Sequence, residues 1–160
     1  MTETLIVYYS RTGRTRMVAE KLGALLGADV EEIREAKKRS GLLGAFGAGK
    51  DTVLDRPAEL TAAPSAEGRR TVVVGMPVWA DKPPPAVRAY LEAVDLAGKA
   101  VCAFCTHGGG GGKKCFAALS SLLPAPPAET AEFKRPKPDD ADLAARLSQW
   151  AEKVRAAGTG

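Results

Sequence analysis

The stretch Ser10-Arg11-Thr12-Gly13-Arg14-Thr15 gives the clearest indication of the fold. Before it lies the apolar run Leu5-Ile6-Val7-Tyr8-Tyr9, which is typical of a strand buried on both faces. After it, apolar residues recur on one face of a predicted helix: Val18, Leu22, Leu25 and Leu26. Gly27 is expected to end that helix. The hexapeptide therefore forms a strand-to-helix turn, where backbone N–H groups and the positive helix end make an anion site.

Side chains of this turn add to the main-chain site. Hydrogen-bond donors and positive charge come from Ser10, Thr12, Thr15, Arg11, Arg14 and Arg16. Gly13 lets the backbone approach a ligand closely. The alternative is an ordinary helix N-cap turn that starts with a serine or threonine. The turn matches neither common nucleotide loop, because it has no G-x-G-x-x-G and no lysine that closes a P-loop.

The composition is that of a globular protein, with 45% hydrophobic and 26% charged residues. The 160 residues fit one domain, 1–160. No apolar run approaches about 18 residues, so neither a membrane span nor a signal peptide is predicted, and we expect a cytoplasmic protein. The net charge is +4, and aromatic residues do not interleave with the basic clusters, so nucleic-acid binding is not expected.

Two of the three cysteines, Cys102 and Cys105, have C-x-x-C spacing. Redox sites of this kind usually open a helix, where the helix end lowers the pKa of a thiol. Here the pair falls in a predicted strand, so the two side chains should point to opposite faces. Three cysteines cannot all pair, and a cytoplasmic setting favours free thiols. Dithiol chemistry is therefore not expected.

The segment 34–70 is rich in glycine and proline, and its periodicity is weak. Within it, Gly44–Lys50 has the P-loop spacing G-x-x-x-x-G-K. No strand precedes this stretch, and Asp51 stands where a Mg²⁺-binding hydroxyl is needed. We therefore interpret this stretch as a surface loop with glycine turns, and such a loop has room to lie near a bound ligand.

The remaining sequence alternates between apolar runs and helical periodicity. Further strands are predicted at 28–33, 71–75, 100–104 and 129–133. Three helices are predicted from their apolar faces, which are Val87-Tyr90-Leu91-Val94, Phe116-Leu119-Leu123 and Leu143-Leu147-Trp150-Val154. Asp139 and Asp140 are expected to cap the last helix. The alternation indicates an α/β fold, with a five-stranded parallel sheet of order 2-1-3-4-5 and helices on both faces.

In such a sheet, ligands bind at the carboxyl edge, near strands one and three. The loop Gly75–Asp81 carries Trp79 at its tip, where an indole is costly to leave in water without a stacking partner. The alternative is that Trp79 folds back onto the following helix. The loop Thr106–Gly112 contains five consecutive glycines, which let backbone N–H groups approach a planar ligand edge. The alternative there is a flexible surface tip.

These loops resemble the three flavin-binding loops of the flavodoxin family. The turn Ser10–Thr15 is similar to the FMN-phosphate loop, Gly75–Trp79 to the loop that places an indole against the isoalloxazine, and the glycine loop to the one beside the flavin pyrimidine. The resemblance implies a flavodoxin-like three-layer sandwich of the short-chain form, with FMN as cofactor. The FMN-binding residues that it implies are Ser10, Arg11, Thr12, Gly13, Arg14, Thr15, Pro77, Val78, Trp79, Ala80, Thr106, His107, Gly108, Gly109 and Gly112. No catalytic residue or metal ligand is expected.

The chain departs from the family in charge and in two loop residues. Flavodoxins tend to be acidic, many carry a stacking tyrosine in the loop that is glycine-rich here, and a glycine often stands where this chain has Ala80. The resemblance implies an electron carrier for partner redox proteins or a small electron acceptor. An NAD(P)H-dependent quinone or flavin reductase is the alternative, and a module that has lost its flavin is a third. The absence of a second nucleotide loop favours the carrier, and the missing aromatic favours the reductase.

Overall fold

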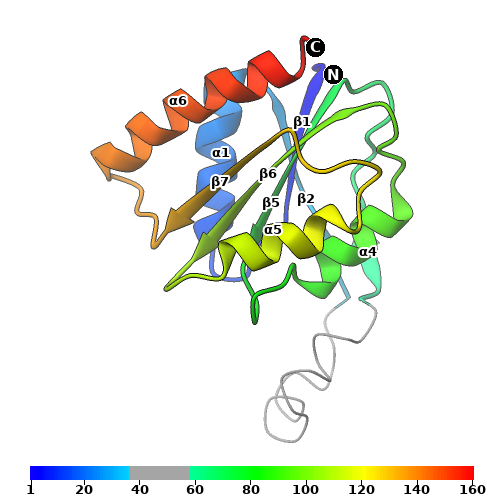
Figure 1. The fold of residues 1–160 in the computed structure, drawn as a ribbon, viewed down its shortest axis with the longest axis horizontal. Coiled ribbons are helices and arrows are strands. Elements are labelled where there is room, and N and C mark those ends of the chain that lie inside the picture. The colour runs from blue at the N-terminus through cyan, green and yellow to red at the C-terminus, as the bar shows by residue number, and fades with distance from the viewer. Residues whose placement is uncertain (37–57) are drawn as a thin grey trace, which may run out of the picture.

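A computed structural model describes residues 1–36 and 58–160. A five-stranded parallel sheet with the order β2-β1-β5-β6-β7 forms its centre (Figure 1). The strands of this sheet are β1 (Thr4–Tyr8), β2 (Asp29–Glu32), β5 (Thr71–Pro77), β6 (Ala100–His107) and β7 (Glu129–Lys134). Taken in chain order, these strands give the predicted order 2-1-3-4-5. The α/β fold and the sheet topology are confirmed.

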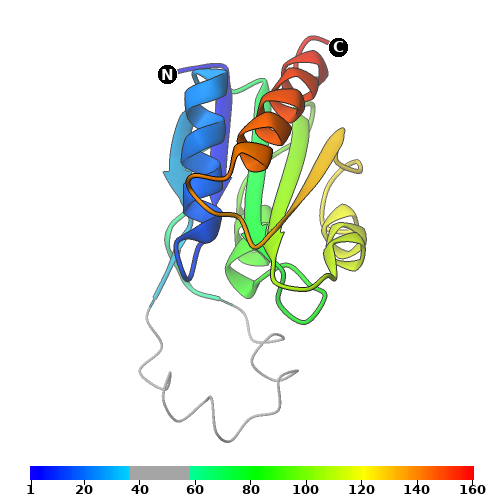
Figure 2. The same cartoon turned by 90° about the vertical axis from the view of Figure 1, so that its left-hand side faces the viewer.

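Helices cover both faces of the sheet and make it the middle of three layers. Figure 2 shows α1 (Arg14–Leu26) and α6 (Ala141–Ala157) on one face, and α4 (Pro85–Ala93) and α5 (Gly112–Ser120) on the other. A second, two-stranded antiparallel sheet pairs β3 (Arg34–Glu35) with β4 (Leu60–Ala62). The sequence analysis did not predict this small sheet. The interpretation of Gly44–Lys50 falls outside the described residues.

Two apolar cores lie between the layers because side chains alternate along each strand. In β1, Leu5 and Val7 pack toward α4 and α5, whereas Ile6 and Tyr8 pack toward α1 and α6. All four are buried, which explains the unbroken apolar run of this strand. The core under α6 contains a cluster of three edge-to-face rings, Phe104, Phe133 and Trp150, with centroids 6.1 to 6.4 Å apart.

The predicted helix ends agree with the structure at both α1 and α6. Gly27 follows α1 in the left-handed conformation, at φ 60°, which glycine adopts without strain. The carboxylate of Asp140 caps α6 by accepting hydrogen bonds from the N–H groups of Asp142 and Leu143. One detail of the α1 prediction is wrong, since Leu25 is an exposed residue rather than a member of the buried face.

The predicted strand placement of the C-x-x-C pair is confirmed. Cys102 packs in the core under α1 and α6, and Cys105 packs with Cys115 in the opposite core. Burial raises the pKa of Cys102 to about 11 and that of Cys115 to about 12, and it also raises the pKa of Cys105. The three thiols therefore stay protonated at neutral pH, as inert core groups.

No helix among the described residues combines the length and the apolar character that a membrane crossing requires.

An ion pair between the buried Arg69 and the half-buried Asp29 ties the chain start to the amino edge of the sheet. The Arg69 guanidinium contacts the Asp29 carboxylate and donates to the Thr2 carbonyl oxygen at 2.6 Å. Asp29 also accepts a hydrogen bond from the Thr2 backbone N–H at 3.0 Å. This backbone bond, followed by the contact with Arg69, lowers the pKa of Asp29 to about 2.

We expect Asp29→Asn to reduce the dependence of stability on acid. The Asp29 pKa is about 2 in the folded chain and near 3.8 when unperturbed, so its contribution is complete above pH 4 and disappears as the pH falls through 2. Urea unfolding between pH 5 and pH 2 measures the effect. The variant should be less stable than the parent at pH 5 and should lose less stability on acidification. Glu67→Gln, at an exposed position, is the control, and equal pH profiles for parent and Asp29→Asn would contradict the assignment.

Candidate functional site

The candidate site lies at the carboxyl edge of the sheet, along the lower edge in Figure 1. Two backbone hydrogen bonds continue the sheet pairing into its loops. The Tyr9 N–H donates to the Gly75 carbonyl oxygen at 3.0 Å, and the Val78 N–H donates to the Thr106 carbonyl oxygen at 3.0 Å. The loops after β1, β5 and β6 are therefore held side by side, as the sequence predicted for its three unusual loops.

The N-cap residue of α1 supplies no side-chain cap of its own, because it is a glycine. Gly13 is the N-cap residue, at φ 91°, and a Cβ placed there would meet no atom within 4 Å. The Ser10 hydroxyl oxygen accepts from the N–H groups of Gly13 at 3.1 Å and Arg16 at 3.3 Å. The N–H groups of Arg14 and Thr15, in the first turn, have no acceptor within the helix. This open set of main-chain donors at a positive helix end fits a phosphate group.

Thr12 and Thr15 differ in where their hydroxyls lie. Thr12 is exposed with Arg11 and Arg14 on the loop, whereas Thr15 is buried and its Oγ1 lies 2.9 Å from Thr106 Oγ1. In such a pair one hydroxyl donates to the other, and the accepting hydroxyl keeps its own hydrogen. The Thr15 side chain thus joins the β1 loop to the end of β6 across the sheet.

The loop after β5 contains a tight two-residue turn. Trp79 and Lys82 exchange backbone hydrogen bonds of 3.0 and 2.9 Å, and Ala80 and Asp81 between them have φ of 48° and 64°. This is the geometry of a primed turn, which favours glycine or asparagine. Ala80, Asp81 and Arg135 are the only non-glycine residues of the described chain with positive φ, and all three follow strands at this edge. Such strained residues gather at functional sites.

The Trp79 indole lies against the loop that follows β1. The Tyr9 ring meets it edge-on, with centroids 5.6 Å apart, and the Arg11 guanidinium carbon lies 5.6 Å from its centroid. The Tyr9 hydroxyl donates to Glu35 Oε1 at 2.5 Å, so Tyr9 is fixed in turn. Burial and this bond raise the pKa of Tyr9 and keep its phenol neutral. The sequence analysis missed Tyr9 and Glu35, although the aromatic position next to Ser10 could have indicated the first.

His107 faces inward beneath the glycine loop. Its Nδ1 accepts from the Gly110 N–H at 3.0 Å, its Nε2 lies 3.3 Å from Glu132 Oε1, and its side chain is 10% exposed. Because Nδ1 accepts a hydrogen bond, the ring proton resides on Nε2, toward Glu132. His107 therefore orders the loop from below. The sequence analysis did not predict the contribution of Glu132.

The glycines of this loop serve two different purposes. A Cβ on Gly111 would collide with Asp81 Oδ1, and one on Gly112 would collide with the Glu132 carboxylate. Gly112 is accordingly buried, whereas Gly108 and Gly109 are exposed, with nothing within 4 Å of a Cβ. The last two glycines thus admit neighbouring side chains, and the first two leave open space beside the Trp79 loop.

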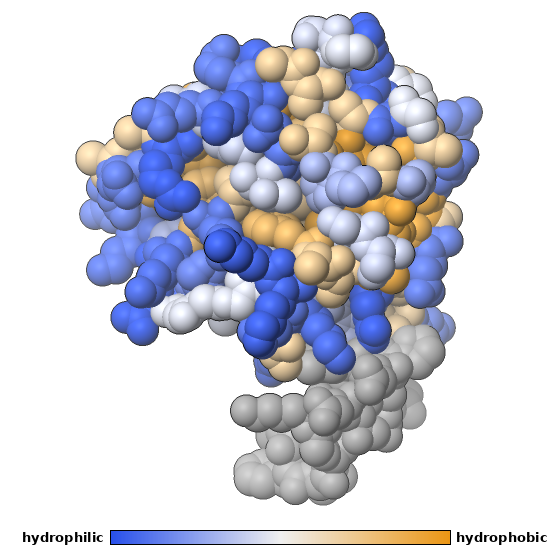
Figure 3. All heavy atoms as spheres, in the orientation of Figure 1, coloured by the Kyte–Doolittle hydropathy of each residue, from blue (hydrophilic) through white to orange (hydrophobic). Residues whose placement is uncertain are grey.

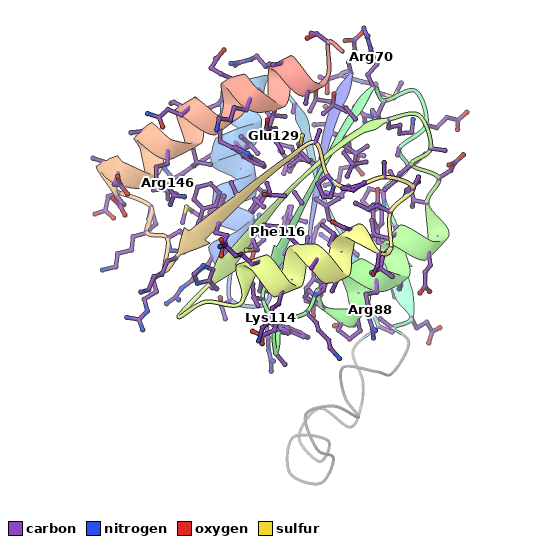
Figure 4. The ribbon with its side chains drawn as sticks, viewed as in Figure 1. Arg70, Arg88, Lys114, Phe116, Glu129 and Arg146 are labelled. Atoms are coloured by element: carbon purple, nitrogen blue, oxygen red, sulfur yellow. The ribbon has the colours of Figure 1, made fainter. Side chains whose placement is uncertain are left out.

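Two cations fasten the glycine loop from outside. Lys114 Nζ lies 3.2 Å from Asp81 Oδ2, which joins the start of α5 to the turn after Trp79. Figure 4 shows Lys114 at the lower edge of the molecule. Arg135, which follows β7, donates from Nε to the Gly108 carbonyl oxygen at 2.9 Å. Its backbone N–H donates to the His107 carbonyl oxygen, also at 2.9 Å. Pro77 and Val78 complete the site as partly buried residues at the end of β5.

Comparisons with known proteins agree with this geometry, which is that of a flavodoxin-like α/β protein. The family model described as Flavodoxin matches residues 48–153, so the chain belongs to the flavodoxin family. The match begins after the turn Ser10–Thr15. A search of curated proteins found no match.

Solved structures are similar to the chain at low sequence identity. A structure described as a flavoprotein from Bacteroides uniformis is 22% identical, with 94% of this chain and 97% of that one covered and a TM-score of 0.78. A flavoprotein from Lactobacillus acidophilus in complex with FMN is 21% identical, with 82% and 93% covered and a TM-score of 0.64. An NADH:FMN oxidoreductase in its apo form is 17% identical, with 97% and 89% covered and a TM-score of 0.64. These likenesses support the fold.

We expect Ala80→Gly to stabilise the protein. Glycine adopts the left-handed conformation at φ 48° without the roughly 1–2 kcal/mol that a Cβ adds, although it loses about 0.5–1 kcal/mol more chain entropy. The free energy of unfolding in urea should rise by about 0.5–1 kcal/mol. Ala89→Gly makes the same change inside α4 and should lower stability by about 1 kcal/mol. A loss of stability in both variants would show that the turn after Trp79 stores no strain.

Proposed function

We propose that the chain binds FMN at the carboxyl edge of the sheet and carries electrons to and from partner redox proteins. The observation that carries this proposal is the start of α1 beside the Trp79 loop, where the N–H groups of Arg14 and Thr15 have no acceptor among the described residues. Membership of the flavodoxin family supports FMN as the cofactor, and so does the similarity to a flavoprotein in complex with FMN. When bound, FMN supplies the reversible electron transfer, and the protein supplies binding and electrostatics.

In this proposal the start of α1 holds the phosphate. The N–H groups of Arg14 and Thr15 and the Thr12 hydroxyl donate to its oxygens, and the exposed Arg11 and Arg14 side chains add positive potential. Ser10 keeps the loop in shape, because its oxygen already accepts two backbone N–H groups. Thr15 anchors the loop through its bond to Thr106.

The loops after β5 and β6 hold the ring system. Trp79 offers an indole whose edge contact with Tyr9 limits its motion, with apolar Val78 beside it. The N–H groups of Gly108 and Gly109 have no acceptor among the described residues and can donate to the polar edge of a flavin. His107 and Gly112 act from below, by giving the glycine loop its shape.

The reductase is a second candidate, favoured by one observation. Gly108, Gly109 and Gly110 have no side chain that could cover the outer face of a flavin, and a Cβ at any of them would meet no atom within 4 Å. An open face would admit a hydride donor or a quinone. Steady-state oxidation of NADH and NADPH by the FMN-loaded protein, with and without a quinone, separates the two candidates. The carrier should oxidise neither nucleotide beyond the rate of free FMN.

We expect Thr12→Val to weaken FMN binding by about ten- to a hundredfold, which corresponds to roughly 1.5–3 kcal/mol for a hydrogen bond to a charged oxygen. Riboflavin, which lacks the phosphate, should bind parent and variant equally. Titration of the apoprotein, followed by flavin fluorescence, gives both affinities. Thr12→Ser keeps the hydroxyl and is the matched control. Equal weakening of FMN and riboflavin would show that Thr12 does not contact the phosphate.

We expect Trp79 to account for most of the tryptophan fluorescence lost when FMN binds, because a stacked indole is quenched by the flavin. Trp150 serves as the internal reference, since it is buried between Phe104 and Phe133 in the core under α6. Trp79→Phe should remove most of the quenching while retaining an aromatic ring. Quenching that persists in this variant would rule out stacking on Trp79.

A further inference from the structure

Exposed cations surround the candidate site and come from four separate segments. Arg14 opens α1, Lys82 follows the turn after Trp79, Lys113 lies in the first turn of α5, and Lys134 and Lys137 lie at and after the end of β7. We name these five residues the basic rim. All five are exposed, and none has an ion-pair partner within residues 1–36 and 58–160. In Figure 3, hydrophilic side chains gather along this lower edge of the described chain.

Most acidic side chains of the same edge, in contrast, already have partners within the protein. Asp81 pairs with Lys114, Glu132 faces the His107 ring, and Glu35 accepts from the Tyr9 hydroxyl. Asp140 accepts from the first N–H groups of α6. Among the described acids here, only Glu59, next to Ala36, and Asp139 have neither an ion pair nor a side-chain hydrogen bond.

The edge therefore presents a positive field to solvent, because the five rim cations are exposed and unpaired, whereas most of the described acids accept hydrogen bonds or an ion pair within the protein. A phosphate at the start of α1 would offset the charge of Arg14. The four lysines come from other loops, so the field beside Trp79 and the glycine loop persists when FMN is bound. Charges spread over several rigid loops favour a broad, charged partner face, because each adds to the steering potential.

We infer that the basic rim is the docking surface for a redox partner protein with a carboxylate-rich face. This inference rests on the proposed function, since an electron carrier must bring its partner close to the cofactor edge. Complementary charge would raise the rate of encounter and orient the partner over the loops that follow β5 and β6. A single-stranded nucleic acid would also use exposed aromatic rings as stacking platforms, and each rim residue ends instead in an ammonium or a guanidinium group.

The test uses the FMN-loaded protein, reduced by dithionite, and two haem proteins of opposite charge as electron acceptors. The acidic acceptor is cytochrome b5 and the basic acceptor is cytochrome c, and stopped-flow absorbance follows the reduction of either haem. The second-order rate constant with cytochrome b5 should fall by about tenfold or more between about 20 and 300 mM salt. With cytochrome c it should rise over the same range.

A matched pair of charge-reversal variants locates the effect on the surface. Lys82→Glu/Lys113→Glu changes two rim lysines, and Arg70→Glu/Lys153→Glu makes the same change in net charge at exposed residues elsewhere. Figure 4 shows Arg70 at the opposite end of the molecule from Lys114. At low salt the rim variant should reduce cytochrome b5 about tenfold or more slowly than the control variant. Thermal unfolding and FMN titration of each variant establish that both fold and bind the cofactor.

Equal rates for the two variants, or a cytochrome b5 rate that does not change with salt, would overturn the inference. So would tighter binding of a single-stranded oligonucleotide than of cytochrome b5, measured by fluorescence anisotropy. A chain that binds no FMN would defeat the proposed function instead. In that case binding of labelled cytochrome b5 to the apoprotein and to the two variants still tests the docking surface.

Discussion

The continuation of parallel strand pairing beyond the ends of the strands is the interaction on which the site depends. The bonds from Tyr9 to Gly75 and from Val78 to Thr106 hold three loops at fixed spacing. Without them, neither the start of α1 nor the Trp79 turn would have a defined neighbour. A parallel sheet brings the carboxyl ends of its strands to one edge, so residues far apart in sequence can form one surface there.

Secondary contacts at this edge then fix the loops individually. Each loop is fastened by a group from another element, as with Asp81 and Lys114, Tyr9 and Glu35, or His107 and Glu132. These contacts engage most of the acidic side chains at this edge and hold the turns with positive φ in place. The same ion pairs and hydrogen bonds therefore preorganise the loops and leave the rim cations unpaired.

The sequence was sufficient for the features that depend on local pattern. The buried strands, the glycine after α1 and the aspartate cap of α6 follow from burial, φ preference and hydrogen bonding within a few residues. Leu25 was misplaced because the helical period alone does not reveal where packing against a neighbour ends. The partners of His107 and Trp79 could not be predicted, because Glu132 and Tyr9 lie 25 and 70 positions away and meet them only in the folded sheet. The turn at Ala80 was missed because alanine is an unfavourable residue for a left-handed position.

The division of the three thiols between two apolar layers gives the molecule built-in reporters of its own opening. Cys102 lies beneath α1 and α6, whereas Cys105 on β6 and Cys115 on α5 lie in the core between the sheet and the layer of α4 and α5. Since all three are buried, an alkylating reagent reaches each one only when the helix layer on its side separates from the sheet. The order in which the cysteines react therefore records which half of the sandwich opens first, without any label being added to the chain.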